Sequence, residues 1–574
     1  MSDALNARTG PDTGQDTGQA PAAPRSDAGR ANGPAADWWR GAVIYQIYPR
    51  SFQDSNGDGI GDLGGIHDRL DHVARLGADA VWISPFFPSP MKDFGYDVSD
   101  YCGVDPMFGS LDDFDRLIAR AQELDLKVLI DLVFNHTSEQ HPWFRESRAS
   151  RDNPRSNWYV WADPRPDGTP PNNWLSIFGG SAWHWDSRRC QYYLHNFLAS
   201  QPDLNFHEPA VQDALLDVAR FWLDRGVAGF RLDTINFYAH DAALRDNPPL
   251  PPERRNDTIA PAVNPYNHQE HLYSKNRPET VHFLGRLRAL MDDYGAVALG
   301  EVGDAQHGLE ILGEYTTGTD RVQMCYAFEF LAREMPTAEH VAEVLTRLQS
   351  VAADGWACWA FSNHDVMRHV TRWHLNYAAT RAYVKLLICL RGTVCIYQGE
   401  ELGLPEAELP FEALRDPYGI EFWPEFKGRD GCRTPMVWDE HAPSGGFSVG
   451  LPWLPVPPSH LPLALATQEA DPGALLHHYR RVIGMRHAHP ALATGTMSPP
   501  RVQGPVLSFE RAQGAERILC VFNLSGGPAS FDVPEGTWLG IDSEPAIGLY
   551  HSEGPLDLGP WQVCLLLHED QPQG

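Results

Sequence analysis

From residue 38 onward, short runs of β-branched and aromatic residues alternate with longer amphipathic segments. Apolar strands that alternate with helices are typical of a parallel sheet whose outer face is covered by helices. Eight such units predict a closed (β/α)8 TIM barrel of the α/β class rather than an open doubly wound sheet. No GxGxxG motif follows a strand, so a dinucleotide-binding fold lacks its signature. The predicted strands span residues 42–48, 79–84, 127–133, 227–233, 296–301, 324–330, 356–361 and 393–397.

Two departures from this regular spacing predict further domains. Residues 139–205 lie between the third and fourth strands and are rich in Trp, Asn, Pro and Gly. They predict a small domain inserted into the barrel, which comprises residues 37–138 and 206–485. Residues 486–574 contain short strands separated by turns, which predicts a C-terminal antiparallel β-sandwich. Residues 1–36 contain one Leu and no aromatic residue, so they are predicted to form a disordered tail.

The chain is strongly acidic, because 46 Lys and Arg residues oppose 75 Asp and Glu residues for a net charge of −29. Such a surface repels phosphate backbones and anionic lipids, which excludes nucleic-acid and membrane-surface partners. No apolar run reaches the roughly 18 residues of a spanning helix, and no signal-peptide stretch is present. The nine cysteines form no CxxC pair and are expected to be reduced core residues. We therefore predict a soluble cytoplasmic protein that is a monomer or a homodimer.

Polar residues follow four of the predicted strands at their carboxyl ends, where barrels of this kind carry their chemistry. Three carboxylates, two histidines and an arginine at four strand ends are too many to be isolated structural pairs. Carboxylic acids can protonate a glycosidic oxygen and stabilise an oxocarbenium-like centre, so this rim favours sugar chemistry. The polar residues are Asn135, His136, Arg231, Asp233, Thr234, Glu301, Asn363, His364 and Asp365.

The motifs at these strand ends resemble conserved regions of the α-amylase superfamily, glycoside hydrolase family 13. DLVFNHTS, GFRLDT, GEV and FSNHD occur in the expected order on the expected strands. The resemblance covers nearly everything after residue 37, including the inserted domain B and the C-terminal β domain. QPDLN (201–205), KGRDGCRTPMVWD (427–439) and PWLPV (452–456) resemble the oligo-1,6-glucosidase subfamily, which includes bacterial α-glucosidases and sucrose-modifying enzymes.

The resemblance implies roles for the three carboxylates. Asp233 is similar to the family's nucleophile, Glu301 to its general acid/base, and Asp365 to the third carboxylate, which holds substrate hydroxyls. Retention is implied, with the two catalytic carboxyls about 5–5.5 Å apart. Arg231 lies two residues before Asp233 and so on the same strand face, where it would keep the nucleophile ionised. Because Glu301 must be protonated for the first step, its surroundings are expected to raise its pKa.

The resemblance also implies a closed pocket for one terminal glucose. His136 and His364 resemble the histidines that hydrogen-bond the glucose ring. Asp97, in GYDVSDY, looks like the aspartate that pairs with an arginine at the pocket floor. Arg433 is the preferred partner and Arg429 the second choice. Such a floor blocks a longer non-reducing end, so an exo-acting enzyme is expected.

Thr234, directly after the predicted nucleophile, bears on linkage preference. In enzymes that this chain resembles, valine at this place goes with α-1,6 bonds and threonine or alanine with α-1,4 bonds. We therefore expect an α-glucosidase that cleaves short α-1,4 substrates such as maltose, with sucrose also possible and transglucosylation to alcohol or sugar acceptors. The alternatives are an oligo-1,6-glucosidase, a sucrose or trehalose mutase, and a non-catalytic carbohydrate-binding member. FEFLAREMPTA stands where sucrose isomerases carry an arginine-rich loop, which disfavours isomerisation.

The sequence DSNGDGIGD after the first strand predicts a structural metal loop. Oxygen ligands at every second position, with glycine turns between them, suit a hard divalent cation. The loop resembles the Ca²⁺ or Mg²⁺ site of the same subfamily, whereas the histidine and cysteine ligands of zinc are missing. No organic cofactor is expected. The candidate ligands are Asp54, Asn56, Asp58, the carbonyl of Ile60 and Asp62.

Overall fold

The computed structural model describes residues 37–543, 547–552 and 554–569. Eight parallel strands form one sheet in the order β10-β11-β1-β2-β3-β7-β8-β9. A parallel bridge between Cys325 in β9 and Ala357, next to β10, joins the two edges of this sheet. The predicted barrel is confirmed, and the predicted tail lies outside the described residues. The barrel strands are β1 (Val43–Ile47), β2 (Ala80–Ile83), β3 (Lys127–Leu132), β7 (Gly229–Leu232), β8 (Val297–Val302), β9 (Met324–Ala327), β10 (Cys358–Ala360) and β11 (Thr393–Tyr397).

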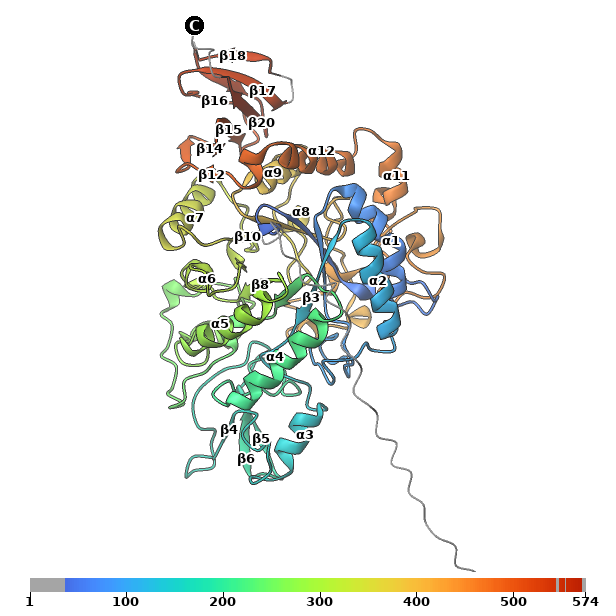
Figure 1. Ribbon diagram of the computed structural model, residues 1–574, viewed down its shortest axis with the longest axis vertical. Helices are drawn as coiled ribbons and strands as arrows, with labels where there is room; N and C mark the ends of the chain where they lie inside the picture. Colours follow the sequence, from blue (N-terminus) through green and yellow to red (C-terminus); the bar gives the residue numbers. More distant parts are fainter. Residues whose placement is uncertain (1–36, 544–546, 553, 570–574) are drawn as a thin grey trace, which may run out of the picture.

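Helices cover the outer face of the barrel (Figure 1). Local sequence explains their bounds, as in α2, where Ser110 and Asp113 form a reciprocal capping box. The same helix buries Phe114, Leu117 and Ala121, which recur at the helical spacing of one face. The helices of the barrel and its carboxyl-terminal extension are α1 (Leu63–Leu76), α2 (Leu111–Glu123), α4 (Pro209–Leu223), α5 (Glu279–Asp292), α6 (Gly308–Thr316), α7 (Ala338–Val351), α8 (His369–Arg372), α9 (Tyr377–Cys389), α10 (Pro417–Glu421), α11 (Leu465–Ala470), α12 (Leu475–Ala488) and α13 (Pro490–Ala493).

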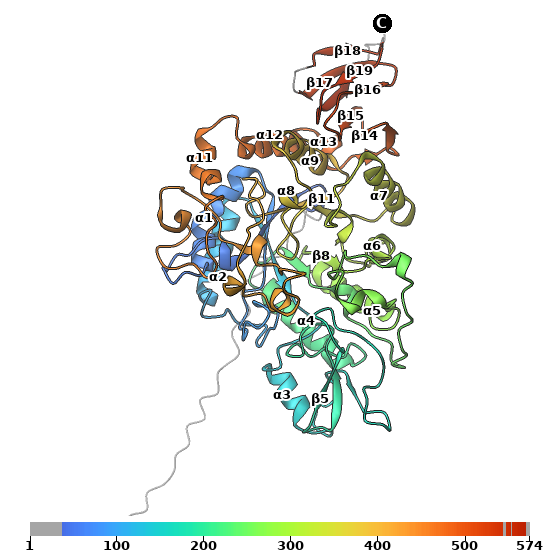
Figure 2. The ribbon, with the colours of Figure 1, turned by 180° about the vertical axis from the view of Figure 1, so that it is seen from behind.

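The insertion after β3 contains α3 (Pro142–Ala149) and a small antiparallel sheet with the order β4-β6-β5. It has its own apolar cluster, in which Trp174 and Trp183 stack with ring centroids 5.9 Å apart. Figures 1 and 2 show this insertion at the end of the barrel opposite the C-terminal sheets. The strands are β4 (Trp161–Ala162), β5 (Trp183–Asp186) and β6 (Gln191–Leu194).

The C-terminal region forms two antiparallel sheets. Seven strands make the larger one, and β16 pairs with β19 in the smaller one. Phe531 and Leu556 of the small sheet share an apolar cluster with Val506, Leu519 and Trp538 of the large sheet, so the two sheets pack face to face. The strands are β12 (Thr496–Met497), β13 (Arg501–Gln503), β14 (Val506–Gln513), β15 (Glu516–Asn523), β16 (Ala529–Phe531), β17 (Thr537–Ser543), β18 (Leu549–His551), β19 (Leu556–Leu558) and β20 (Val563–His568).

The cysteines are free thiols, and seven of the nine are buried. Burial raises the pKa of the Cys564 thiol to about 12, so at neutral pH it is a protonated, apolar group. None of the helices in the described part of the chain is long and apolar enough to cross a membrane.

Candidate active site

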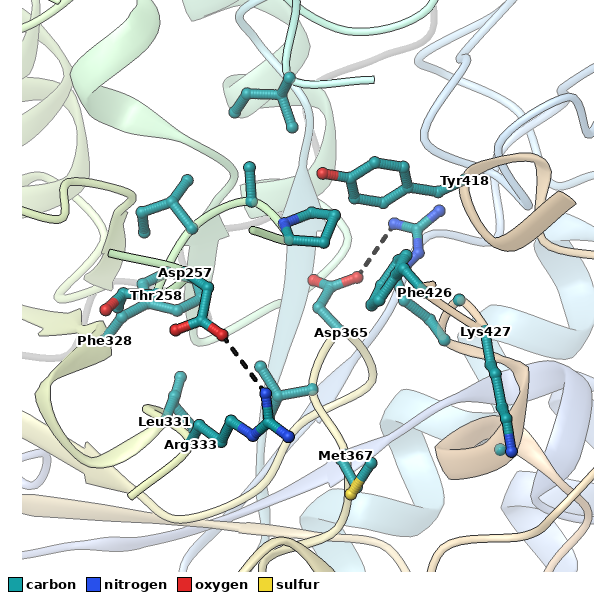
Figure 3. A pocket seen from close by; sticks show the side chains of 18 of the residues that line it. Asp257, Thr258, Phe328, Leu331, Arg333, Asp365, Met367, Tyr418, Phe426 and Lys427 are labelled. Atoms are coloured by element: carbon teal, nitrogen blue, oxygen red, sulfur yellow. Dashed lines mark hydrogen bonds and ion pairs between the residues drawn. The ribbon is translucent and has the colours of Figure 1, made fainter. Parts of the chain in front are cut away.

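A cavity of about 690 Å³ opens at the carboxyl ends of the barrel strands. Asp233, Glu301 and Asp365 line it together with His136 and Thr234. These residues come from the ends of β3, β7 and β8, which are neighbours in the barrel, and of β10, which lies beyond β9. The strand-end residues predicted from sequence therefore meet in one cavity, as the carboxyl face of a barrel requires. Figure 3 shows Asp365 near the centre of this cavity.

Arg231 is a buried cation shared by several acidic groups. Its Nη1 donates to Asp233 Oδ1 at 2.6 Å and to both oxygens of Asp131 at 2.9 and 3.0 Å. Its Nη2 donates to Glu301 Oε2 at 2.6 Å and to the Tyr326 hydroxyl at 2.7 Å. The guanidinium is fully buried, so these charge-assisted bonds are little screened by solvent. One arginine thus fixes both predicted catalytic carboxyls.

Thr234 contacts both of these carboxyls from an unusual backbone conformation. Its backbone N–H donates to Glu301 Oε2 at 3.1 Å, and its hydroxyl donates to Asp233 Oδ2 at 3.2 Å. Its φ of 40° lies in the left-handed region, where a β-branched residue is strained. Arg231 also uses Oε2 of Glu301, so Oε1 is the oxygen left to carry a proton into the cavity.

Asp365 is surrounded by positive charge. Its Oδ1 accepts from Arg429 at 3.1 Å and from Arg433 at 2.9 Å, and its Oδ2 lies 3.2 Å from His364 Nε2. Burial opposes the ionised form, but His364, Arg429 and Arg433 outweigh it and hold the pKa of Asp365 below its usual value. This carboxyl is therefore an anion at neutral pH.

The other two carboxyls have the opposite environment. Burial raises the pKa of Glu301 to about 7, although Arg231 opposes this shift and Asp233 adds to it. This confirms the expected rise. Burial likewise raises the pKa of Asp233 to about 7, with Arg231 opposing and Asp131 adding to it. The two carboxyls share Arg231, and the negative charge of Asp233 raises the pKa of Glu301, so ionisation of Asp233 favours the protonated form of Glu301.

The predicted pairing of Asp97 with Arg433 is wrong. The Asp97 carboxylate accepts from the Ser89 hydroxyl at 2.8 Å and from the backbone N–H groups of Lys92 and Asp93 at 3.0 and 3.1 Å. These hydrogen bonds satisfy the Asp97 carboxylate within the loop that follows β2, so it does not pair with Arg433. Asp93 lines the cavity instead, four residues earlier in the chain.

Asp93 pairs with Arg429, which was the second choice. Arg429 Nη2 donates to Asp93 Oδ1 at 2.9 Å and to Asp416 Oδ1 at 2.8 Å. The guanidinium also lies over the ring of Phe178, 5.4 Å from its centroid. Arg433 is fully buried and contacts Asp365 and the His364 carbonyl, so it supports the third carboxylate.

The two predicted histidines lie differently. His136 lines the cavity, and its Nε2 lies 3.0 Å from the Tyr96 carbonyl. His364 is fully buried, with Nδ1 2.7 Å from Gln46 Nε2 and Nε2 2.6 Å from the Tyr96 hydroxyl. Burial lowers the pKa of both, to about 4 for His136 and about 3 for His364, so both rings are neutral.

Asp131 and Tyr326 were missed from the sequence. Asp131 is the register partner of Arg231 on the neighbouring strand, and it accepts from Trp82 Nε1 at 3.2 Å and from the Tyr96 hydroxyl at 3.1 Å. A single Asp within the apolar run KVLIDLV is the signal that could have found it. No comparable signal marks Tyr326.

The predicted metal loop forms a series of tight turns. The side chains of Asn56 and Asp58 each accept a hydrogen bond from the backbone N–H two residues further on. The Asp54 carboxylate accepts from several backbone N–H groups of the same loop. Asp62 instead caps α1 and accepts from Gly65 N–H at 2.6 Å. Across the described residues, no three His, Cys, Asp or Glu side chains come together as a metal-binding group.

Comparison with known proteins places this chain in a family. Residues 46–495 match the family described as alpha amylase, catalytic domain. The chain is 66% identical over 506 residues to a probable alpha-glucosidase of Rhizobium meliloti (strain 1021), covering 87% of this chain and 92% of the relative. It is 38% identical over 542 residues to an oligo-1,6-glucosidase of Heyndrickxia coagulans, covering 88% and 95%.

A solved structure supports membership of the same family. The crystal structure of XgtA, an alpha-glucosyl transfer enzyme, is 53% identical with a TM-score of 0.88, covering 93% of this chain and 99% of that one. This chain therefore belongs to the alpha-amylase family, glycoside hydrolase family 13. It is a glycoside hydrolase, and its site carries two carboxyls held by one buried arginine.

Proposed function

We propose that this protein is an exo-acting, retaining α-glucosidase that also transfers glucosyl groups. The observation that carries the proposal is the pair Asp233 and Glu301, both held by Arg231 in a cavity that Asp93 and Arg429 also line. The Asp93–Arg429 pair forms the end of the cavity that receives the non-reducing glucose. A closed end of this kind admits one terminal sugar and excludes a longer chain.

The reaction proceeds in two displacements. Glu301 Oε1 gives its proton to the glycosidic oxygen while an oxygen of Asp233 attacks the anomeric carbon, so the leaving group departs as an alcohol. The product is a covalent glucosyl-Asp233 ester. Glu301, now ionised, then takes a proton from water, and the water oxygen displaces Asp233 with a second inversion. Asp365, an anion held by two arginines, binds hydroxyls of the glucose and stabilises the positive ring.

An alcohol can replace water in the second displacement. The covalent intermediate reacts with any hydroxyl nucleophile that occupies the acceptor side of the cavity. We therefore infer transglucosylation to alcohol or sugar acceptors as a second activity. The similarity to an alpha-glucosyl transfer enzyme supports this inference.

The preferred bond is α-1,4, as in maltose, with Thr234 as the selector. Its hydroxyl and backbone N–H contact the two catalytic carboxyls, so its side chain stands where the aglycone leaves. Products from equal concentrations of maltose, isomaltose and sucrose, with and without an alcohol, test this. Glucose mainly from isomaltose would favour the oligo-1,6-glucosidase alternative, and isomers of sucrose would favour a mutase.

The chemistry itself is tested by Asp233→Ala. This variant is expected to lose at least about a thousandfold of the rate on a nitrophenyl α-glucoside, because the covalent step has no nucleophile. An unchanged rate would remove Asp233 from its role. Anomeric analysis of the first product by NMR tests retention independently.

We also propose a structural Ca²⁺ or Mg²⁺ in the loop after β1. Asp54, Asn56, Asp58 and the Ile60 carbonyl offer oxygen ligands alone, the donor set that such cations take. The Asp54 carboxylate also accepts from the Ser448 hydroxyl, so an ion bound to Asp54 would lie next to the segment that contains Ser448. Asp62 was predicted as a fifth ligand, and its place as the cap of α1 makes it the weakest candidate.

A cytoplasmic location is proposed as well. The buried free cysteines suit a reducing compartment. Fractionation of the source cells with an antibody against this chain tests the location.

A further inference from the structure

Two loops from different parts of the barrel face each other across the cavity. One lies between η4 (Pro252–Arg254) and η5 (Pro265–His268), and the other follows η6 (Phe328–Phe330). Asp257 of the first loop and Arg333 of the second both line the cavity and form an ion pair, with Nη1 3.7 Å from Oδ2. Figure 3 shows the two side chains pointing toward one another.

This ion pair lies on the acceptor side. In Figure 3, Asp257 and Arg333 stand on one side of Asp365, and Tyr418 stands on the other. Tyr418 packs on Phe178 with ring centroids 4.8 Å apart, and Phe178 lies under Arg429 at the closed end. The leaving group or acceptor must therefore occupy the side of Asp365 where the ion pair stands.

The walls beside the ion pair are apolar and belong to the same two loops. Ile259 and Val263 come from the first loop, Leu331 comes from the second, and Phe328 belongs to η6 directly before it. Apolar side chains give no directional bond that would fix the distance between the loops. The Asp257–Arg333 pair is a polar link across this gap, so it restrains how far the walls can separate.

The link is weak and open to solvent. The Arg333 side chain is 78% exposed and the Asp257 side chain is 35% exposed. Exposed pairs contribute little to stability and are screened by salt. The link can therefore restrain the acceptor space without fixing it rigidly.

We propose that the Asp257–Arg333 ion pair is a brace that sets the size of the acceptor space and so selects among acceptors. This inference rests on the proposed glucosyl transfer. With the brace formed, water and short alcohols reach the intermediate more readily than bulky alcohols. When it breaks, the loops separate and the balance moves toward bulky acceptors.

The test measures transfer from a nitrophenyl α-glucoside to 2-phenylethanol relative to ethanol. Salt is raised from about 0.01 M to 1 M, which shortens the screening length from about 30 Å to about 3 Å. In the parent the ratio is expected to rise about two- to fivefold, the range that an exposed ion pair can supply. Asp257→Asn and Arg333→Gln should show the raised ratio at low salt and little further change.

The charge-reversed double variant, Asp257→Arg with Arg333→Asp, separates a brace from direct contact with the acceptor. A brace predicts that this variant regains the low ratio and its salt dependence. If it behaves like the single variants, or if the parent ratio ignores salt, the proposal is overturned. Asp115→Asn is the matched control, because its exposed pair with Arg225 lies outside the cavity and its loss should leave the ratio unchanged. Absence of nitrophenol release from the parent would refute the proposed function instead.

Discussion

Replacing Arg231 by methionine removes the cation that both proposed catalytic carboxyls, Asp233 and Glu301, share. Methionine has similar length and no charge, so the barrel interior keeps its volume but loses the hydrogen bonds. Asp233, Glu301 and Asp131 would then be buried without a counter-ion, since all three accept from this guanidinium. Each must take up a proton more readily than in the parent.

The size of the change follows from these contacts. A hydrogen bond to a charged group contributes about 1.5–3 kcal/mol. One pKa unit corresponds to about 1.36 kcal/mol, so losing one such bond raises the pKa of Asp233 by about one to two units. From a value of about 7 in the parent, Asp233 would become largely protonated at neutral pH. Because about half of Asp233 is already protonated at pH 7 in the parent, protonation alone should lower kcat/KM at pH 7 by about five- to fiftyfold, with lost alignment adding to this.

The assay is the pH profile of kcat/KM on a nitrophenyl α-glucoside. The acid limb, where Asp233 must lose its proton, is expected to move to higher pH by at least about one unit. Arg486→Met is the control, because Arg486 is an equally buried arginine that donates only to backbone carbonyls far from the site. It should lower stability without moving the acid limb. Arg231→Gln, which also removes the positive charge, serves if the methionine variant does not fold. An acid limb that stays in place would refute the shared-cation argument.

Three further outcomes follow from the site. In Glu301→Gln the alkaline limb of the pH profile of kcat/KM, near pH 7 in the parent, should disappear, because the parent loses activity as Glu301 gives up its proton. The rate of maltose hydrolysis by this variant should fall by about 10²- to 10⁴-fold. Asp93→Ala should lower kcat/KM, because it removes the partner of Arg429 in the cavity. Asp97→Ala should act mainly on stability, at a cost of about 1–3 kcal/mol, because it leaves N–H groups of the turn unpaired, and equal effects of the two variants on kcat/KM would contradict the assignment. Adding Ca²⁺ or Mg²⁺ at about a hundredfold excess over Kd should stabilise the parent by about 2.7 kcal/mol, with no rise in Tm for Asp58→Ala.

The barrel could be predicted because its signal is repeated and local. Each buried strand is a short apolar run, and helices alternate with these strands along the chain, so errors at one boundary do not change the fold. The predicted strand 42–48 differs from Val43–Ile47 only at its ends. The meeting of Asp233, Glu301 and Asp365 in one cavity could be predicted because each stands at a strand end, and strand ends of a barrel converge.

The partners of those carboxyls could not be predicted in the same way. Asp93 and Asp97 lie in one loop, and sequence does not show which carboxylate faces the cavity. The structure shows that the Asp97 carboxylate accepts hydrogen bonds from backbone N–H groups of the turn that contains Asp93, so Asp93 is the one that faces the cavity. The choice between Arg429 and Arg433 likewise depends on loop geometry, since both arginines contact Asp365 and only Arg429 reaches Asp93.

The balance of positive and negative charge differs between the surroundings of Asp365 and those of Arg231. This difference indicates which carboxyl carries the catalytic proton. Arg429 and Arg433 both face Asp365, so that carboxyl is ionised at neutral pH. Around Arg231 one cation meets three buried carboxyls, and this excess of negative charge favours a bound proton near neutral pH. Asp233 has the hydroxyl of Thr234 as a further donor, while Glu301 keeps Oε1 free of both Arg231 and Thr234. The proton therefore belongs on Glu301 Oε1, which is where the first step of a retaining glycosidase needs it.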